Sequence, residues 1–157
     1  SLLHKLLIAG FSVECAAENI NCALMIKSDD ETLATLDVLK INLYTGKAEF
    51  YKAGAAFSVV KKGERTALVE QSSLPLGIIK DAQIKKTQLD LSERDCVLLI
   101  SDGAAVLAPE QFKKIFHSKK ADTPEKKVRA VVEHSLEMSV SGRNDDITAA
   151  FVRLKRS

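Results

Sequence analysis

Two short acidic motifs carry the side chains of this chain that are most suited to metal chemistry. The first is Ser101-Asp102-Gly103, which follows the apolar run 96–100, so Asp102 is expected where a buried strand ends. The second holds Asp145 and Asp146 and leads into the apolar run 147–152, so Asp145 is expected where another strand begins.

These carboxylates meet at one edge of a sheet if the two strands pair antiparallel, because the end of one strand then lies beside the start of the other. Sites made only of oxygen atoms suit Mg²⁺ or Mn²⁺, which are hard ions that keep several waters. A water activated by the metal is then the natural nucleophile. Each motif alone is also typical of a structural turn, so the residues by themselves leave a catalytic and a structural interpretation open.

Asp37 is a third carboxylate of interest. It has the same strand parity as Leu39 and Ile41, so we expect it to point inward, where an ionised carboxylate needs a partner. We favour a buried structural aspartate bonded to the backbone, and a role in a functional site is the alternative.

The composition excludes several classes of protein. With 157 residues, of which 46% are apolar and 28% charged, the chain is long enough for one core, and a single domain over residues 1–157 is predicted. The net charge of +2 is small, only 5% of the residues are aromatic and Trp is absent, so we expect no stacking platform for nucleic acid. No apolar run is long enough to cross a membrane, and we expect no direct membrane contact.

The cysteines argue against a disulfide framework and against a zinc site. Cys15, Cys22 and Cys96 are odd in number and form no Cys-x-x-Cys pair. This pattern fits a reducing, cytosolic setting.

The order of the expected elements predicts an α+β protein. Two helices open the chain, the second capped by Ser12 and burying a face that includes Ala23; a hairpin turns at residues 45–46, and further short strands follow. A late helix is expected to start with Thr123 as its cap and to bury Leu136. Helices, then strands, then helices and a closing strand differ from an alternating parallel arrangement.

Six motifs in one order resemble a known family. They are ETLATLD at 31–37, LYTG at 43–46, KAGAA at 52–56, LPLGI at 74–78, SDG at 101–103 and DDIT at 145–148. Over essentially its whole length, the chain resembles the C-terminal phosphatase domain of the stage II sporulation protein E family. Proteins of this family are type 2C metal-dependent serine/threonine phosphatases.

The resemblance implies an α-β-β-α sandwich of antiparallel sheets flanked by helices, with a two-metal Mn²⁺ or Mg²⁺ centre at one edge. It implies that Asp102 and Asp145 are metal ligands, with Gly103, Asp146 and Asp37 as possible supporting residues. The implied reaction is hydrolysis of a phosphoserine or phosphothreonine by metal-activated water, without a phosphoenzyme.

The resemblance also implies a partner and a location. The substrate would be a phosphorylated anti-anti-sigma factor, whose dephosphorylation activates a sporulation sigma factor. The domain would be cytoplasmic, in a parent protein anchored in the bacterial cell membrane.

One departure from the family pattern affects these expectations. The first metal motif of the family, an Asp-Gly-Met-Gly type segment whose Asp bridges both metals, should precede the opening helix, and this sequence begins after that point. We therefore expect the C-terminal part of a domain that lacks its first strands, with little or no activity on its own. An exposed sheet edge would favour a homo-oligomer. The alternative function is a non-catalytic module that binds a phosphoprotein or drives oligomerisation.

Overall fold

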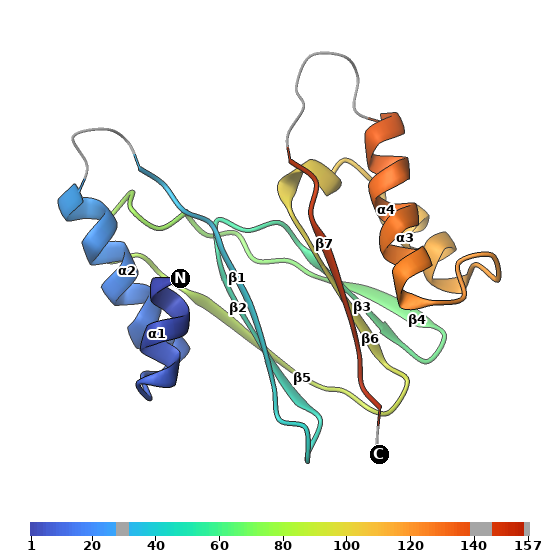
Figure 1. The fold of residues 1–157 in the computed structure, drawn as a ribbon, viewed down its shortest axis with the longest axis horizontal. Helices are drawn as coiled ribbons and strands as arrows, with labels where there is room; N and C mark the ends of the chain where they lie inside the picture. Colours follow the sequence, from blue (N-terminus) through green and yellow to red (C-terminus); the bar gives the residue numbers. More distant parts are fainter. Residues whose placement is uncertain (28–31, 139–145, 156–157) are drawn as a thin grey trace. The chain divides into compact units, whose positions relative to one another are not determined.

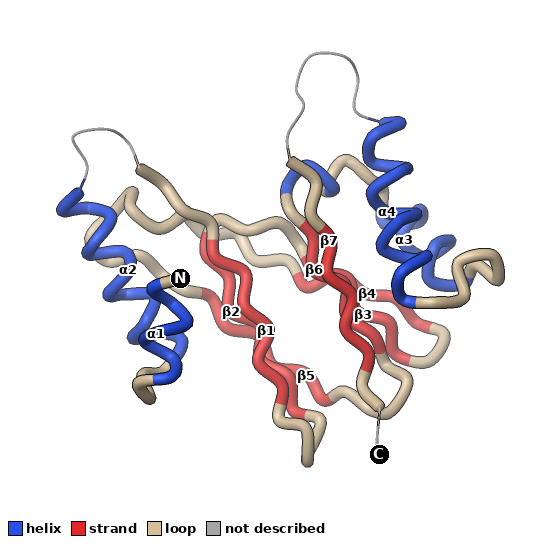
Figure 2. The backbone as a smooth tube through the Cα atoms, viewed as in Figure 1, coloured by secondary structure: helices blue, strands red, loops and turns tan. Residues whose placement is uncertain are grey.

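The computed structural model describes residues 1–27, 32–138 and 146–155. Its internal contacts divide the chain into two compact units. Unit 1 comprises Ser1–Ile41, Ala48–Ala55 and Gln71–Leu89, and unit 2 comprises Asn42–Lys47, Ala56–Glu70 and Asp90–Ser157. Each unit has its own sheet and its own pair of helices (Figures 1 and 2). The prediction of a single domain stays a prediction.

Unit 1 is a three-stranded sheet with two helices on one face (Figure 2). Its strands lie in the order β1-β2-β5, and β1 pairs antiparallel with β2, with Leu36 opposite Ala53. A core that includes Ala17, Leu36, Ala53 and Leu76 joins the helices to the sheet. The elements are α1 (Leu2–Ile8), α2 (Val13–Lys27), β1 (Leu36–Ile41), β2 (Lys47–Ala53) and β5 (Lys85–Asp90).

Helix α2 starts where the sequence predicts, but its buried face differs in one position. The Cys15 amide donates to Ser12 Oγ at 3.1 Å, so Ser12 caps the helix. Asn21 is buried and Ala23 is exposed, which makes the prediction for Ala23 wrong. Asn21 lies one turn from Ala17 on the packed stripe, and its side-chain amide donates to the backbone oxygens of Ile79 and Lys80 at 2.9 and 3.0 Å.

Unit 2 is a four-stranded antiparallel sheet in the order β4-β3-β6-β7, with α3 and α4 on one face (Figure 1). Its core includes Val59 and Leu98 from the strands and Phe112, Phe116 and Val131 from the helices. The elements are β3 (Ser58–Lys62), β4 (Arg65–Val69), β6 (Cys96–Ile100), the short 3₁₀ helix η1 (Asp102–Ala104), α3 (Pro109–His117), α4 (Pro124–Met138) and β7 (Ala149–Arg153). Two antiparallel sheets flanked by helices confirm the predicted α+β class.

Helix α4 begins as predicted and departs from the expected burial at its end. Its cap is Thr123, whose Oγ1 accepts from the Lys126 amide at 3.3 Å, and Pro124 is its first residue. The buried side chains Val131 and Ser135 are one helical turn apart, and Leu136 is 59% exposed. The prediction that Leu136 is buried is therefore wrong, because the serine occupies the packed row.

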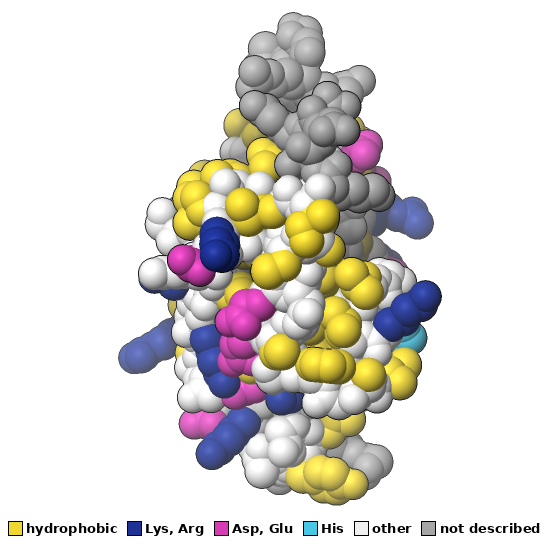
Figure 3. All heavy atoms as spheres, turned by 90° about the vertical axis from the view of Figure 1, so that its left-hand side faces the viewer, with side chains coloured by type: hydrophobic (Ala, Val, Ile, Leu, Met, Phe, Trp, Pro, Cys, Tyr) yellow, Lys and Arg dark blue, Asp and Glu magenta, His cyan; other side chains and the backbone are white. Residues whose placement is uncertain are grey.

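Several large apolar side chains remain on the surface of unit 1. Figure 3 shows such side chains among charged ones on the face that carries α1 and α2. Ile8 is 74% exposed and Ile26 is 88% exposed. Self-association of the chain stays a prediction. Among the described residues, no helix has the length and apolar character needed to span a bilayer.

Candidate active site

The two acidic motifs lie next to one another at one end of the unit 2 sheet. Strand β6, which precedes Asp102, pairs antiparallel with β7, which follows Asp146, and Ile100 lies opposite Ala149. This is the pairing that the sequence analysis required for the two motifs to share an edge. Beyond the last strand pair the chain continues into η1 on one side and into residues 146–148 on the other.

Ser101 joins the two motifs through three hydrogen bonds. Its amide donates to the Thr148 carbonyl at 2.9 Å. Its hydroxyl donates to the Asp146 carbonyl at 2.9 Å and accepts from the Thr148 amide at 2.9 Å. This hydroxyl is absent from the residues predicted from the sequence, although its position directly before the aspartate is a signal that could have suggested a role. Ser101 therefore sets the register of the loop that carries Asp146 against the turn that carries Asp102.

The carboxylates at this edge face water. Asp102 and Asp146 are exposed, whereas Gly103, directly after Asp102, is buried. The Gly103 amide donates to Asp102 Oδ1 at 3.2 Å, which holds one carboxylate oxygen against the start of η1. In the part of the chain that the structure describes, neither carboxylate forms an ion pair with a cationic side chain. Among the described residues, the negative charge of this edge is therefore not paired with a cation.

The other predicted site residues do not extend this cluster. Asp145 lies outside the described residues. Asp37 belongs to unit 1, where its Oδ2 accepts from the Lys52 ammonium at 2.8 Å. Burial lowers the pKa of Lys52, and the carboxylate of Asp37 acts in the opposite direction. The structure thus shows a lysine partner that the sequence analysis did not identify, although the hairpin register places Asp37 directly opposite Lys52.

The donors at the Asp102 edge fit a hard divalent ion in type. Carboxylate and carbonyl oxygens are the ligands that Mg²⁺ and Mn²⁺ prefer. In number the donors fall short of a tight site, because the described residues contain no group of three or more His, Cys, Asp or Glu side chains that could hold a metal. Asp102 and Asp146 are the two carboxylates that the structure places at this edge.

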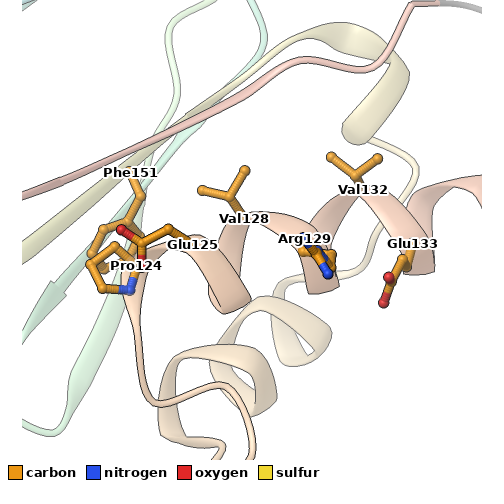
Figure 4. Close-up of a pocket in the computed structure, with 7 residues that line it drawn as sticks. All are labelled: Pro124, Glu125, Val128, Arg129, Val132, Glu133 and Phe151. Atoms are coloured by element: carbon orange, nitrogen blue, oxygen red, sulfur yellow. The ribbon is translucent and has the colours of Figure 1, made fainter.

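A groove of about 740 Å³ opens elsewhere on unit 2, along α4. Val128 and Val132 project from one side of the helix, and Phe151 of β7 lies beside the first turn (Figure 4). Charged groups of both signs, Arg129 and Glu133 among them, also line it. It contains no pair of convergent carboxylates, so we place the candidate site at the Asp102 edge and not in this groove.

The fold is that of the PP2C-type phosphatase domains. The structure matches that of the PP2C phosphatase domain and a regulatory-domain fragment of SpoIIE from Bacillus subtilis with a TM-score of 0.81 and 28% sequence identity, covering 97% of this chain and 47% of that one. It also matches the PPM Ser-Thr phosphatase MsPP from Mycobacterium smegmatis with a TM-score of 0.80 at 16% identity, covering 98% of this chain and 79% of that one, which is a likeness of fold alone.

The family follows from a match to the whole chain. The family model described as Stage II sporulation protein E (SpoIIE) matches residues 1–155, and the chain therefore belongs to this family. Stage II sporulation protein E of Bacillus subtilis is 28% identical over 160 residues, and that of Priestia megaterium is 24% identical over 163 residues. These matches cover 98% and 99% of this chain but only 19% and 28% of the respective relatives. The chain thus spans a minor part of the length of the curated relatives that it matches.

Proposed function

We propose that this chain is the C-terminal part of a metal-dependent protein phosphatase domain that hydrolyses phosphoserine or phosphothreonine. The observation that carries the proposal is the set of Ser101 hydrogen bonds, which join the two acidic motifs at one end of the sheet. Membership of the SpoIIE family and the PP2C-type fold support it.

In this proposal Asp102 and Asp145 are metal ligands, and Gly103 and Asp146 support them. A Mn²⁺ or Mg²⁺ ion bound at this edge supplies a Lewis acid and activates water for attack on phosphorus. Ser101 has a positioning role, because it fixes the backbone on both sides of the metal edge. The ion pair with Lys52 favours a structural role for Asp37.

The proposed substrate is a phosphorylated anti-anti-sigma factor, and its dephosphorylation would activate a sporulation sigma factor. The sporulation family to which the chain belongs supports this choice. We further propose that the domain acts in the cytoplasm, in a parent protein anchored in the cell membrane.

We propose that the 157-residue chain alone has little or no activity, because a two-metal centre needs more carboxylates than the described residues of this edge provide. The test is Mn²⁺-dependent release of phosphate from a phosphorylated anti-anti-sigma factor. This chain is compared with a chain extended upstream through an Asp-Gly metal motif of the family type. We expect release by the extended chain only, and loss of that release in its Asp102→Asn variant. Turnover by the 157-residue chain that Asp102→Asn abolishes would contradict the proposed inactivity.

The alternative is a non-catalytic module that binds a phosphoprotein or drives oligomerisation. One observation favours it, namely that no group of three metal-ligating side chains exists among the described residues. Activity in neither chain, together with partner binding that is unchanged by EDTA, would support this alternative.

A further inference from the structure

A second pocket in unit 2 gathers positive charge at the opposite end of β6 from the metal edge. It has a volume of about 460 Å³, and five of its lining residues are cationic whereas only one, Glu93, is acidic. Cys96, at the start of β6, lies in its wall. Asp102 follows Cys96 by six positions of largely extended chain, a distance of about 20 Å, so the pocket is distinct from the metal edge. The cationic residues are Lys61, Arg94, Lys127, Arg153 and Lys155.

The sheet itself places two of these cations on either side of the cysteine. Lys61 of β3 is opposite Cys96 of β6, and Cys96 is opposite Arg153 of β7. Residues directly opposite one another in antiparallel strands project to the same face. Two like charges therefore flank one thiol on adjacent strands, although like charges placed near one another destabilise a sheet.

Lys127 adds a third cation from helix α4. Its ammonium donates to the carbonyls of Ile115 and Phe116 at 3.1 and 2.9 Å, which fixes it at the C-terminal end of α3. An ammonium has three protons, so one remains for a ligand in the pocket. Burial lowers the pKa of Lys127 and the nearby charge of Lys61 acts in the same direction, whereas Cys96 and Asp122 act in the opposite direction.

The carboxylates near this group are fewer than its cations: Glu93 lines the pocket, Asp122 acts on Lys127, and Glu125 interacts with Arg153. None of the five cations forms an ion pair with another described residue. The nearby Asp95 is already engaged, because its two oxygens accept from the Ser92 and Gly63 amides at 2.8 and 3.3 Å. The pocket is thus a concave site with five cationic residues and one acidic residue in its lining, and with no ion pair between them in the described part of the chain.

We infer that this pocket binds a phosphate group, held by Lys61, Lys127 and Arg153. A phosphate presents several acceptor oxygens, and arginine and lysine are the side chains that bind such oxyanions most strongly. The phosphate can be free inorganic phosphate or the phosphorylated side chain of a protein partner. The site does not rest on the proposed phosphatase activity, and it requires no metal.

The test measures binding to the 157-residue chain in EDTA, in a buffer free of phosphate. Inorganic phosphate is titrated by calorimetry, and a fluorescent phosphoserine peptide is titrated by anisotropy beside the same peptide without its phosphate. We expect saturable binding that weakens at least tenfold in the double variant Lys61→Gln/Arg153→Gln. The control Lys119→Gln/Lys120→Gln removes the same charge from exposed residues outside the pocket and should bind as the parent does.

The outcomes separate the sources of the phosphate. Tighter binding of the phosphopeptide than of inorganic phosphate supports a phosphorylated partner, and equal binding supports free phosphate. Equal losses in the two double variants, equal binding of the unphosphorylated peptide, or no saturable binding would overturn the inference. EDTA keeps these results independent of the metal edge.

A second measurement needs no variant. Phosphate seated between Lys61 and Arg153 should slow alkylation of Cys96 but not of Cys15 or Cys22, which lie in unit 1. Peptide mapping after limited treatment with a maleimide gives the three rates in one sample. Equal rates for Cys96 with and without phosphate would count against the site.

Discussion

Two aspartates that the sequence singles out as candidate site residues have opposite surroundings in the structure. Asp37 on β1 accepts from Lys52 at 2.8 Å, and the Lys52 side chain is fully buried. Asp102, which follows β6, is exposed, and the likewise exposed Asp146 lies in the segment before β7, where its carbonyl accepts from Ser101. Within the described residues, Asp102 has no cationic partner.

The difference separates a structural carboxylate from a candidate ligand. A buried lysine beside an aspartate compensates its charge internally, so the pair contributes to the fold and attracts no external cation. Asp102 and Asp146 lie at one sheet edge without a cationic partner among the described residues, and a divalent ion bound there would supply the opposite charge. Substitution of Asp102 should therefore lower activity and leave stability unchanged, whereas substitution of Asp37 should lower stability.

The largest effect is expected at Asp102. In the extended chain, Asp102→Asn should lower Mn²⁺-dependent phosphate release by about 100-fold or more, because loss of a metal ligand exceeds the 10- to 100-fold cost of losing a residue that only supports one. The variant should unfold at the same urea concentration as its parent, since Asp102 makes no ion pair among the described residues. A variant that retains activity would remove Asp102 from the metal site.

The next effect is expected at Asp37. Asp37→Asn leaves the buried Lys52 ammonium without its counter-charge, and we expect a loss of about 2–3 kcal/mol in the free energy of unfolding. This is below the full cost of breaking a buried pair, because the Asp37 side chain is 18% exposed. Urea unfolding of the 157-residue chain measures it. The double variant Asp37→Leu/Lys52→Met should recover most of the loss, and a single variant as stable as its parent would contradict the structural role.

Ser101→Ala should have a smaller effect, and it should lower both the stability of the fold and the affinity for Mn²⁺. It removes two hydroxyl hydrogen bonds, to the Asp146 carbonyl and from the Thr148 amide, and should cost about 1–2 kcal/mol of stability. In the extended chain it should also weaken Mn²⁺ binding by about tenfold, since the two motifs lose their common support. Ser118→Ala is the matched control, because its hydroxyl also makes two hydrogen bonds to the backbone, accepting from the Lys120 and Ala121 amides in the α3–α4 loop. Equal Mn²⁺ affinity in both variants would show that Ser101 is structural only.

Short-range patterns in the sequence predict the strands but not the contacts that depend on tertiary structure. The apolar run before Asp102 and the one after Asp146 predict β6 and β7, and their antiparallel pairing is confirmed. The exposure of Leu136 was not predictable from helical periodicity alone, because Ser135, which donates to the Val131 carbonyl at 2.7 Å, takes the packed position. A polar residue that is buried because its side chain hydrogen-bonds to a carbonyl of its own helix leaves no apolar signal in the sequence.

The partner of Asp37 illustrates the same limit. A lysine is expected at the surface, so Lys52 at zero exposure contradicts the composition rule on which core prediction depends. Its burial follows from the register of the hairpin that turns at residues 45–46, because this register places Lys52 directly opposite Asp37. A register argument made from the turn outward could therefore have found the pair.

The smallest effect concerns Glu49, a third carboxylate with its own set of donors. Its oxygens accept from Tyr51 Oη and Gln88 Nε2, each at 2.8 Å, and pair with the Lys86 ammonium at 2.7 Å. Hydrogen bonding to Lys86, and then to Tyr51 and Gln88, lowers the pKa of Glu49 from 4.5 to about 2. Glu49 is thus paired with a cation, as Asp37 is, but it lies at the surface of unit 1.

The sign of the pH effect follows from that lowered pKa. The unfolded chain binds the proton of Glu49 near pH 4.5, whereas the folded chain binds it only near pH 2. The contribution of Glu49 to stability is therefore complete above pH 4.5 and is lost as the pH falls towards 2. Glu49→Gln should be less stable than its parent at pH 7, and the difference should narrow at pH 3. Glu133→Gln, a change at an exposed residue of α4, is the control and should leave the pH profile of the melting temperature unchanged. If the difference in stability between Glu49→Gln and its parent stays constant from pH 7 to pH 3, the charge of Glu49 is not stabilised by the donors around it. A neighbouring cation would then not be enough to identify a carboxylate as structural.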